Sequence, residues 1–103
     1  MNTINETAIN HIKLTIEDHK QALKRYRHVR QSDVDNAIKG LTVGKSILEQ
    51  HDDPDAIGTN FKDALKYFQH QPTVSHSIQT CYLFYQTLKD IHDKKERTKH
   101  ASV

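Results

Sequence analysis

Apolar side chains recur every three or four residues along most of this chain, which is the spacing of one face of an α-helix. No segment alternates apolar and polar residues over a useful length, as a half-buried strand would. The pattern predicts four helices, over residues 4–30, 34–50, 54–70 and 73–97. The first of them carries the apolar series Ile9, Ile12, Ile16, Leu23 and Tyr26, which is interrupted only by His19. The apolar face of the second helix is expected to comprise Val34, Ala37, Leu41, Gly44 and Leu48, and that of the fourth Val74, Ile78, Cys81, Tyr85 and Leu88, widened by Tyr82, Phe84 and Ile91.

Short polar side chains mark the expected helix starts. Thr3 and Glu6 have the spacing of a capping box, in which each side chain satisfies a backbone N–H near the other. Ser32 or Asp33 is expected to cap the second helix. Asp53 followed by Pro54 predicts the third start, because proline at the first helical position loses no hydrogen bond.

Four amphipathic helices with short connections predict an all-α, antiparallel four-helix bundle with up-down-up-down topology. At 103 residues and 11.9 kDa the chain is expected to form one domain, residues 1–103. Gly44 lies on the apolar face of the second helix, where we expect a close approach of two helices. The residues from Lys94 to Val103 are basic and polar, and we expect this C-terminal tail to fray.

Few features point to a compartment. The single Cys81 cannot form an internal disulfide, which suits a reducing environment. The first residues lack the basic and apolar regions of a signal peptide. No apolar run approaches the roughly 20 residues of a membrane span. We therefore expect a soluble, cytoplasmic protein.

The residues that carry chemistry are dispersed. Eight histidines are present, yet no two of them have the i, i+3 or i, i+4 spacing of a helical zinc site. Cys81 lies in an apolar stretch, where a thiol keeps a high pKa and acts as a small hydrophobe. His19 is expected to be buried and hydrogen-bonded rather than a ligand. We expect no catalytic, cofactor or metal site, and hence no enzyme.

Positive charge gathers in two places. Residues 1–30 carry +3, residues 31–53 carry −3 and residues 72–103 carry +2, within a total of +2. Cations near helix C-termini are favoured by the helix dipole, which is one explanation. The alternatives are contacts with an anionic membrane or with nucleic-acid phosphates. The candidate contact residues in these two places are Lys20, Lys24, Arg27, Lys94, Lys95 and Arg97.

The second candidate surface is the aromatic run at residues 81–85, where five successive side chains point all around a helix. One apolar face cannot bury all of them, so we expect Leu83 to face away from the core. Two interpretations remain open for this run. Either the fourth helix packs on several sides, or Tyr82, Leu83 and Phe84 form a contact patch for a partner.

The middle of the chain combines a Ser32-Asp33 helix start, the Asp53-Pro54 turn and an apolar helix ending in Tyr67-Phe68. In these features it resembles the immunity proteins for pediocin-like bacteriocins. The chain differs from that family in the third helix, where it has Asn60, Lys62 and Asp63. The resemblance implies a bundle at the inner membrane face that recognises a toxin-bound sugar-transporter receptor, with the C-terminal half setting specificity.

Our functional prediction is a non-enzymatic protein-interaction module of a small bacterial protein, in its narrower form a bacteriocin immunity protein acting at the inner membrane face. Its partner would be another protein, associated with the membrane in that narrower form. The alternative is a small nucleic-acid-binding protein, or a phage- or plasmid-encoded regulatory adaptor, that uses the basic stripe of the first helix. Pairing of two copies into a homodimer stays open at this stage.

Overall fold

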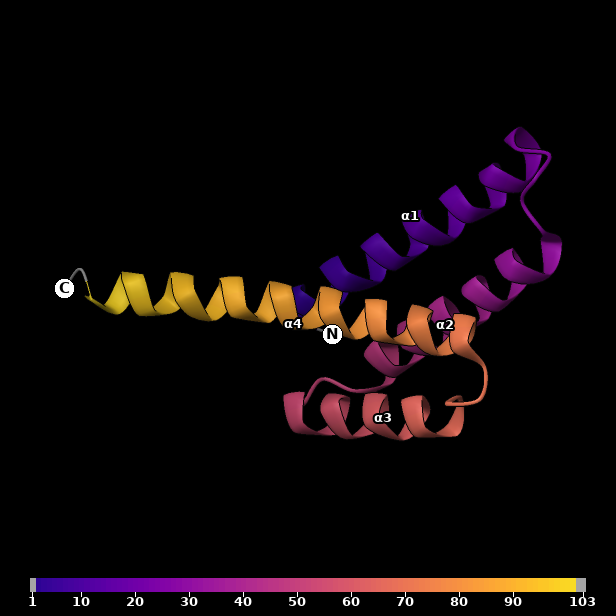
Figure 1. Ribbon diagram of the computed structural model, residues 1–103. Helices are drawn as coiled ribbons and strands as arrows, with labels where there is room; N and C mark the ends of the chain where they lie inside the picture. Colours follow the sequence, from indigo (N-terminus) through magenta and orange to yellow (C-terminus); the bar gives the residue numbers. More distant parts are fainter. Residues whose placement is uncertain (1, 102–103) are drawn as a thin grey trace.

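The computed structural model describes residues 2–101 of the chain, with side chains for residues 2–96. These residues form four helices: α1 (Thr3–Arg25), α2 (Gln31–Gln50), α3 (Pro54–Tyr67) and α4 (Pro72–Ala101). Successive helices run in opposite directions (Figure 1). The predicted all-α four-helix bundle is therefore confirmed.

The bundle is built around the pair α2 and α4, which share the most extensive contact. Helices α1 and α3 lie on opposite sides of this pair, and within the described residues they do not touch each other (Figure 1). Helix α4 is the longest at 30 residues and projects beyond the other three. The molecule is accordingly elongated, with extents of 56 × 30 × 19 Å.

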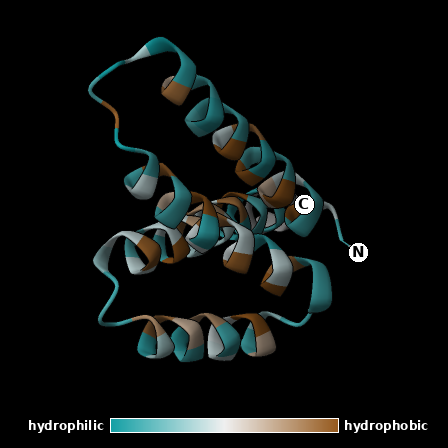
Figure 2. Ribbon diagram, turned by 90° about the vertical axis from the view of Figure 1, so that its right-hand side faces the viewer, coloured by the Kyte–Doolittle hydropathy of each residue, from teal (hydrophilic) through white to brown (hydrophobic). Residues whose placement is uncertain are grey.

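The core lies where the apolar faces of the helices meet. Figure 2 shows hydrophobic positions recurring along one side of α1 while its other side is hydrophilic. The predicted apolar face of α2 is buried from Val34 to Leu48. The main cluster of buried residues comprises Ala8, Ile9, Ile12, Leu41, Leu48, Ile57, Phe61, Val74, Ile78, Cys81 and Tyr85.

Two glycines allow α2 and α4 to approach closely. A Cβ atom on Gly44 would overlap Cβ and Sγ of Cys81, and one on Gly40 would overlap the Val74 carbonyl and the Ser77 Cβ. The close approach expected at Gly44 is confirmed. Gly40, one turn earlier, has the same role, which we did not predict.

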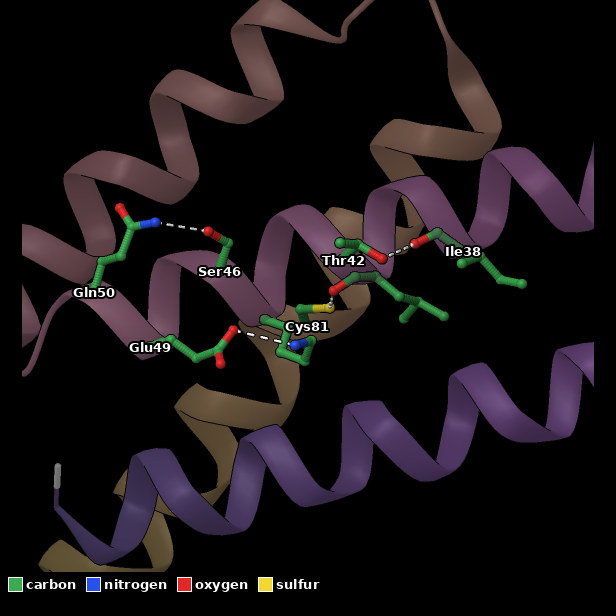
Figure 3. A network of polar contacts seen from close by, with 8 residues as sticks. Ile38, Thr42, Ser46, Glu49, Gln50 and Cys81 are labelled. Carbon is green, nitrogen blue, oxygen red and sulfur yellow. Dashed lines mark hydrogen bonds and ion pairs between the residues drawn. The ribbon is translucent and has the colours of Figure 1, made fainter.

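Cys81 sits at this crossing and is fully buried. Its Sγ points from α4 to α2 and donates to the Leu41 carbonyl oxygen at 3.7 Å (Figure 3). Burial raises the pKa of this thiol to about 12. The thiol therefore stays protonated near neutral pH and serves as a small packing group, as expected.

Asn5 fastens the start of α1 to the end of α2. The side chain is fully buried, and its Nδ2 donates to the carbonyl oxygens of Leu48 and His51 at 2.9 and 2.7 Å. The last carbonyls of a helix lack partners within that helix, so these bonds satisfy groups that would otherwise be left unpaired. This contact joins residues more than 40 positions apart in the sequence.

Several predicted helix ends are wrong. Helix α1 ends at Arg25 rather than near residue 30, because Tyr26 adopts an extended backbone (φ −122°, ψ 117°) and its side chain finds no cover. Tyr26 is 53% exposed, which also contradicts its expected place on the apolar face. The residues after it, up to Arg30, bring mainly like charges that a further helical turn would crowd.

The expected caps are wrong at two of three starts. Asn2 caps α1 through a bond from the Asn5 N–H at 2.8 Å, so Thr3 already lies inside the helix. Helix α2 begins at Gln31 after Arg30 and has no side-chain cap. The third prediction is confirmed, since Asp53 accepts from the Ala56 N–H at 3.0 Å and Pro54 opens α3.

Two further boundaries differ from the expected ones. Helix α3 ends at Tyr67 rather than His70, because Phe68 leaves the helical conformation. Helix α4 continues to Ala101 instead of ending near residue 97. Fraying of the basic tail stays a prediction.

Candidate partner-binding groove

An apolar groove runs along the seam between α1 and α4. On α1 it is lined by Ile4, Thr7 and His11, and on α4 by Phe84, Leu88 and Ile91. Both sets have the three-to-four-residue spacing of one helix face, so the two rows of side chains lie side by side along the seam. We call this surface the α1–α4 groove.

The groove exists because α4 extends past the core. The buried face of α4 against α2 is formed by Val74, Ile78, Cys81 and Tyr85. Beyond Tyr85 the apolar series continues with Leu88 and Ile91, which line the groove together with the first turns of α1. Leu88 is therefore half-buried and Ile91 is 46% exposed.

The rim of the groove is polar and basic. His11, His92 and Lys95 border it, and no Asp or Glu is among the described residues that line it. The His11 ring lies 6.0 Å from the Phe84 ring at an interplanar angle of 44°. The Lys95 side chain forms no ion pair within the described part of the chain. A ligand with acidic groups beside an apolar face would complement this lining.

Lys89, another cation on this part of α4, does not line the groove and is already paired. Lys89 contacts the Asp93 carboxylate four residues later at 3.1 Å. This hydrogen bond and the negative charge of Asp93 raise the pKa of Lys89. Its charge is thus balanced within α4, whereas the charge of Lys95 is left for another group.

The three predicted aromatic-run residues face three directions. The Tyr82 ring stacks on Phe61 of α3, with centroids 4.8 Å apart and an interplanar angle of 16°. Phe84 faces α1 and lines the groove. Leu83 lies between them on the outer side of α4 and is 51% exposed, as expected. They do not form one patch, because successive residues on a helix are rotated by about 100°.

The predicted basic residues are also divided. Of the C-terminal group, Lys95 lines the groove, whereas Lys94 is exposed and does not line it. The side chain of Arg97 lies outside the described residues. Lys20, Lys24 and Arg27 are exposed at the far end of α1, away from the projecting end of α4 (Figure 1). The candidate residues therefore belong to two separate surfaces.

Sequence reasoning missed most of the groove. Ile4, His11, Leu88 and Ile91 were not candidate site residues, although Leu88 and Ile91 were placed on the apolar face of the fourth helix. The available signal was that this apolar series continues beyond the stretch that α2 is long enough to cover. Ile4 and His11 gave no comparable signal, because nothing in the sequence says which flank of α4 packs against α1.

The described residues contain no group of three or more His, Cys, Asp or Glu side chains placed to hold a metal ion. His19, the histidine on the apolar face of α1, is half-buried, and its Nδ1 lies 2.8 Å from the Thr15 carbonyl oxygen. Among the described helices, none combines the length and the apolar character that crossing a membrane requires.

Comparison with known proteins gives no match to a family model, to a curated protein or to a solved structure. Inference about function therefore starts from the surfaces described above.

Proposed function

We propose that this protein is a non-enzymatic interaction module that binds an amphipathic helix of another protein in the α1–α4 groove. The observation that carries the proposal is the partial exposure of this part of α4, where Phe84, Leu88 and Ile91 line a groove together with residues of α1. Helix-in-groove recognition uses apolar anchors at such three-to-four-residue spacing.

The chemistry of the rim supports an acidic partner. Lys95, His11 and His92 border the apolar floor, and carboxylates are absent from its described lining. Charged groups at a rim favour partners of opposite charge and add to the rate of association. The proposed occupant is therefore a helix whose apolar face is flanked by Asp or Glu.

A photo-reactive amino acid placed at Thr87, which lies between Phe84 and Ile91 in the groove region, tests the proposal in cells of the native host. A matched probe replaces the exposed Lys62 on α3. We expect a cross-linked partner from Thr87 that is absent from Lys62. The purified partner should then bind the purified protein, and its cross-linked segment should be an acidic amphipathic helix. Equal cross-linking from both positions, or cross-linking of a second copy of this chain alone, would contradict the proposal.

Two exposed apolar residues of α4 provide a matched pair for the reconstituted complex. Ile91 lies in the groove, whereas Leu83 is equally exposed on the outer side of the same helix. Ile91→Asp should weaken partner binding by about tenfold or more, because it places a charge against apolar contacts. Leu83→Asp should change it little. The reverse order would move the site to the outer side of α4.

A narrower form of the proposal identifies the partner's setting. The resemblance to bacteriocin immunity proteins supports a cytoplasmic protein whose partner is a toxin-bound receptor at the inner membrane face, with the C-terminal half of the chain setting specificity. Expression in sensitive strains should then protect against a pediocin-like toxin, and Ile91→Asp should remove that protection. If the chain protects against none of a panel of such toxins, the narrower form fails while the groove proposal stands on its own tests.

A further inference from the structure

The C-terminal end of α1 and its connection to α2 carry the strongest positive charge of the described surface. Five cations, Lys20, Lys24, Arg25, Arg27 and Arg30, lie within eleven residues, and all are exposed. Together with Tyr26 and His28 they form what we call the basic tip. None of these five side chains forms an ion pair within the described residues.

The net positive charge of the chain is concentrated at the basic tip. Between residues 19 and 36 the only acids are Asp33 and Asp35, at the start of α2. The Asp35 carboxylate accepts a bond from Gln31 Nε2 at 2.8 Å, so it is engaged within its own helix. This segment carries +3, and since the total is +2 the rest of the chain carries −1. An anionic ligand would therefore be drawn to this end of the molecule.

The tip also presents an aromatic surface. The Tyr26 side chain is 53% exposed, and its ring lies 6.0 Å from the His28 ring at an interplanar angle of 51°. Both residues lie in the non-helical connection, between cations on either side in the sequence. Aromatic faces among Lys and Arg side chains are the combination that binds single-stranded nucleic acid, with bases stacked on rings and phosphates held by cations.

A membrane surface fits these residues less well. Adsorption to a bilayer uses buried apolar area in addition to charge. Most residues along this connection are hydrophilic (Figure 2), and Tyr26 is the one large apolar side chain of the tip that is mostly exposed. A duplex fits less well too, because Tyr26 and His28 lie in the non-helical connection rather than on a helix or ribbon that could enter a groove.

We propose that the basic tip binds single-stranded nucleic acid, with Tyr26 and His28 stacking on bases and Lys24, Arg27 and their neighbours holding the phosphates. This site goes beyond the proposed function, since it lies at the opposite end of the molecule from the projecting end of α4 and shares no residue with the α1–α4 groove (Figure 1).

Fluorescence anisotropy with a short labelled oligouridylate tests the proposal. Binding should weaken as salt rises, with a log–log slope of about −2 if three phosphates are neutralised. Lys24→Glu/Arg27→Glu should weaken it by about tenfold or more at low salt. The matched control Lys62→Glu/Lys66→Glu, on two exposed lysines of α3, makes the same change in net charge and should have a much smaller effect. Lys24→Gln/Arg27→Gln replaces the first variant if that one does not fold.

Substitutions of Tyr26 separate stacking from charge. Tyr26→Ala should weaken binding by about fivefold, whereas Tyr26→Phe, which keeps the ring, should bind like the original protein. Absence of binding at low salt, or equal loss in the α3 control, would overturn the proposal. So would equal affinity for a duplex of the same length, or adsorption to phosphatidylserine vesicles without binding to the oligouridylate.

Discussion

Helix α4 has two halves that differ in what surrounds them. From Val74 to Tyr85 its inner face is buried against α2, and its flanks are covered by α1 and α3. From Leu88 onward the described residues have α1 as their main neighbour, and most of them are exposed. The same helix thus supplies the centre of the core and one wall of the α1–α4 groove.

This difference separates stability from recognition. Buried area contributes to folding in proportion to the apolar surface removed from water, so the first half of α4 should hold the fold together. The second half has apolar groups that are only partly removed from water, and their remaining surface is available to a partner. The following substitutions test this division, starting with the largest expected effect.

Isoleucine truncation compares the two halves directly. Ile78 is fully buried and Ile91 is 46% exposed. Ile78→Ala should lower the free energy of unfolding by about 3 kcal/mol, because it removes buried methyl groups and leaves a cavity. Ile91→Ala should lower it by less than about 1 kcal/mol. Urea unfolding followed by circular dichroism measures both, and equal losses would show that the two halves are equally well packed.

Glycine substitution tests the crossing of α2 and α4. Gly44→Ala should lower the free energy of unfolding by about 2 kcal/mol, because the added Cβ overlaps Cys81 and the gain in helix propensity offsets only part of that cost. Gly58 on α3 is the matched control, since a Cβ added there would meet only the Tyr82 hydroxyl within 4 Å, at 3.2 Å. Gly58→Ala should change stability by less than about 1 kcal/mol in thermal unfolding. A Gly44→Ala variant as stable as the original would mean that the crossing has room to open.

Asn5 is the polar contact that we expect to matter most for stability. Asn5→Ala should cost about 1.5 kcal/mol, because the carbonyls of Leu48 and His51 lose their donors. Asn10, which is exposed on the same helix, is the control, and Asn10→Ala should cost less than about 0.5 kcal/mol. Chemical denaturation of the two variants compares them. Similar midpoints would indicate that water replaces the lost bonds.

Cys81 links the crossing to pH. Its pKa is raised to about 12 in the folded state from an ordinary value of 9.0, so the unfolded chain releases this proton first as pH rises. The contribution of Cys81 to the free energy of unfolding is complete below pH 9, and it is lost as pH rises from there towards about 12. Between pH 9 and 10 the free energy of unfolding should fall by about 1 kcal/mol through this group.

Comparison with Cys81→Ala isolates that contribution from other groups that titrate at high pH. The free energy of unfolding should fall less steeply above pH 9 in the variant than in the original protein, as measured by urea titrations at each pH. In the folded original, the thiol should react with a thiol reagent only as fast as the protein opens. Rapid labelling under native conditions would contradict its burial at the crossing.

Much of the fold could be predicted from the sequence because periodicity reports directly on which helix face is buried. The apolar faces of the second and fourth helices and the Asp53–Pro54 turn were predicted in this way. The caps of the first two helices were not, since several short polar residues stand near each start. The choice among them depends on tertiary contacts such as the one that Asn5 makes.

The candidate site was less accessible to sequence reasoning. The pattern indicates how many faces of α4 are apolar, but not which helix covers each face. Phe84 and Lys95 were singled out and line the groove, whereas Tyr82 packs on α3.

Asn5, outside the groove, left a signal in the sequence, because it lies four residues before Ile9 and so falls on the buried face of α1. A polar residue in that position suggests a buried hydrogen bond.

The position of Asn5 has a consequence for the opposite end of the α1–α2 pair. The side chain ties the two helices together at the end remote from their connection, and the glycine crossing holds α2 against α4 in between. Residues 26–30 are therefore not needed to hold α1 and α2 together. Extra residues inserted there would cost little beyond the modest entropy of a longer loop. Binding to another molecule, rather than folding, can therefore determine which residues occupy that connection.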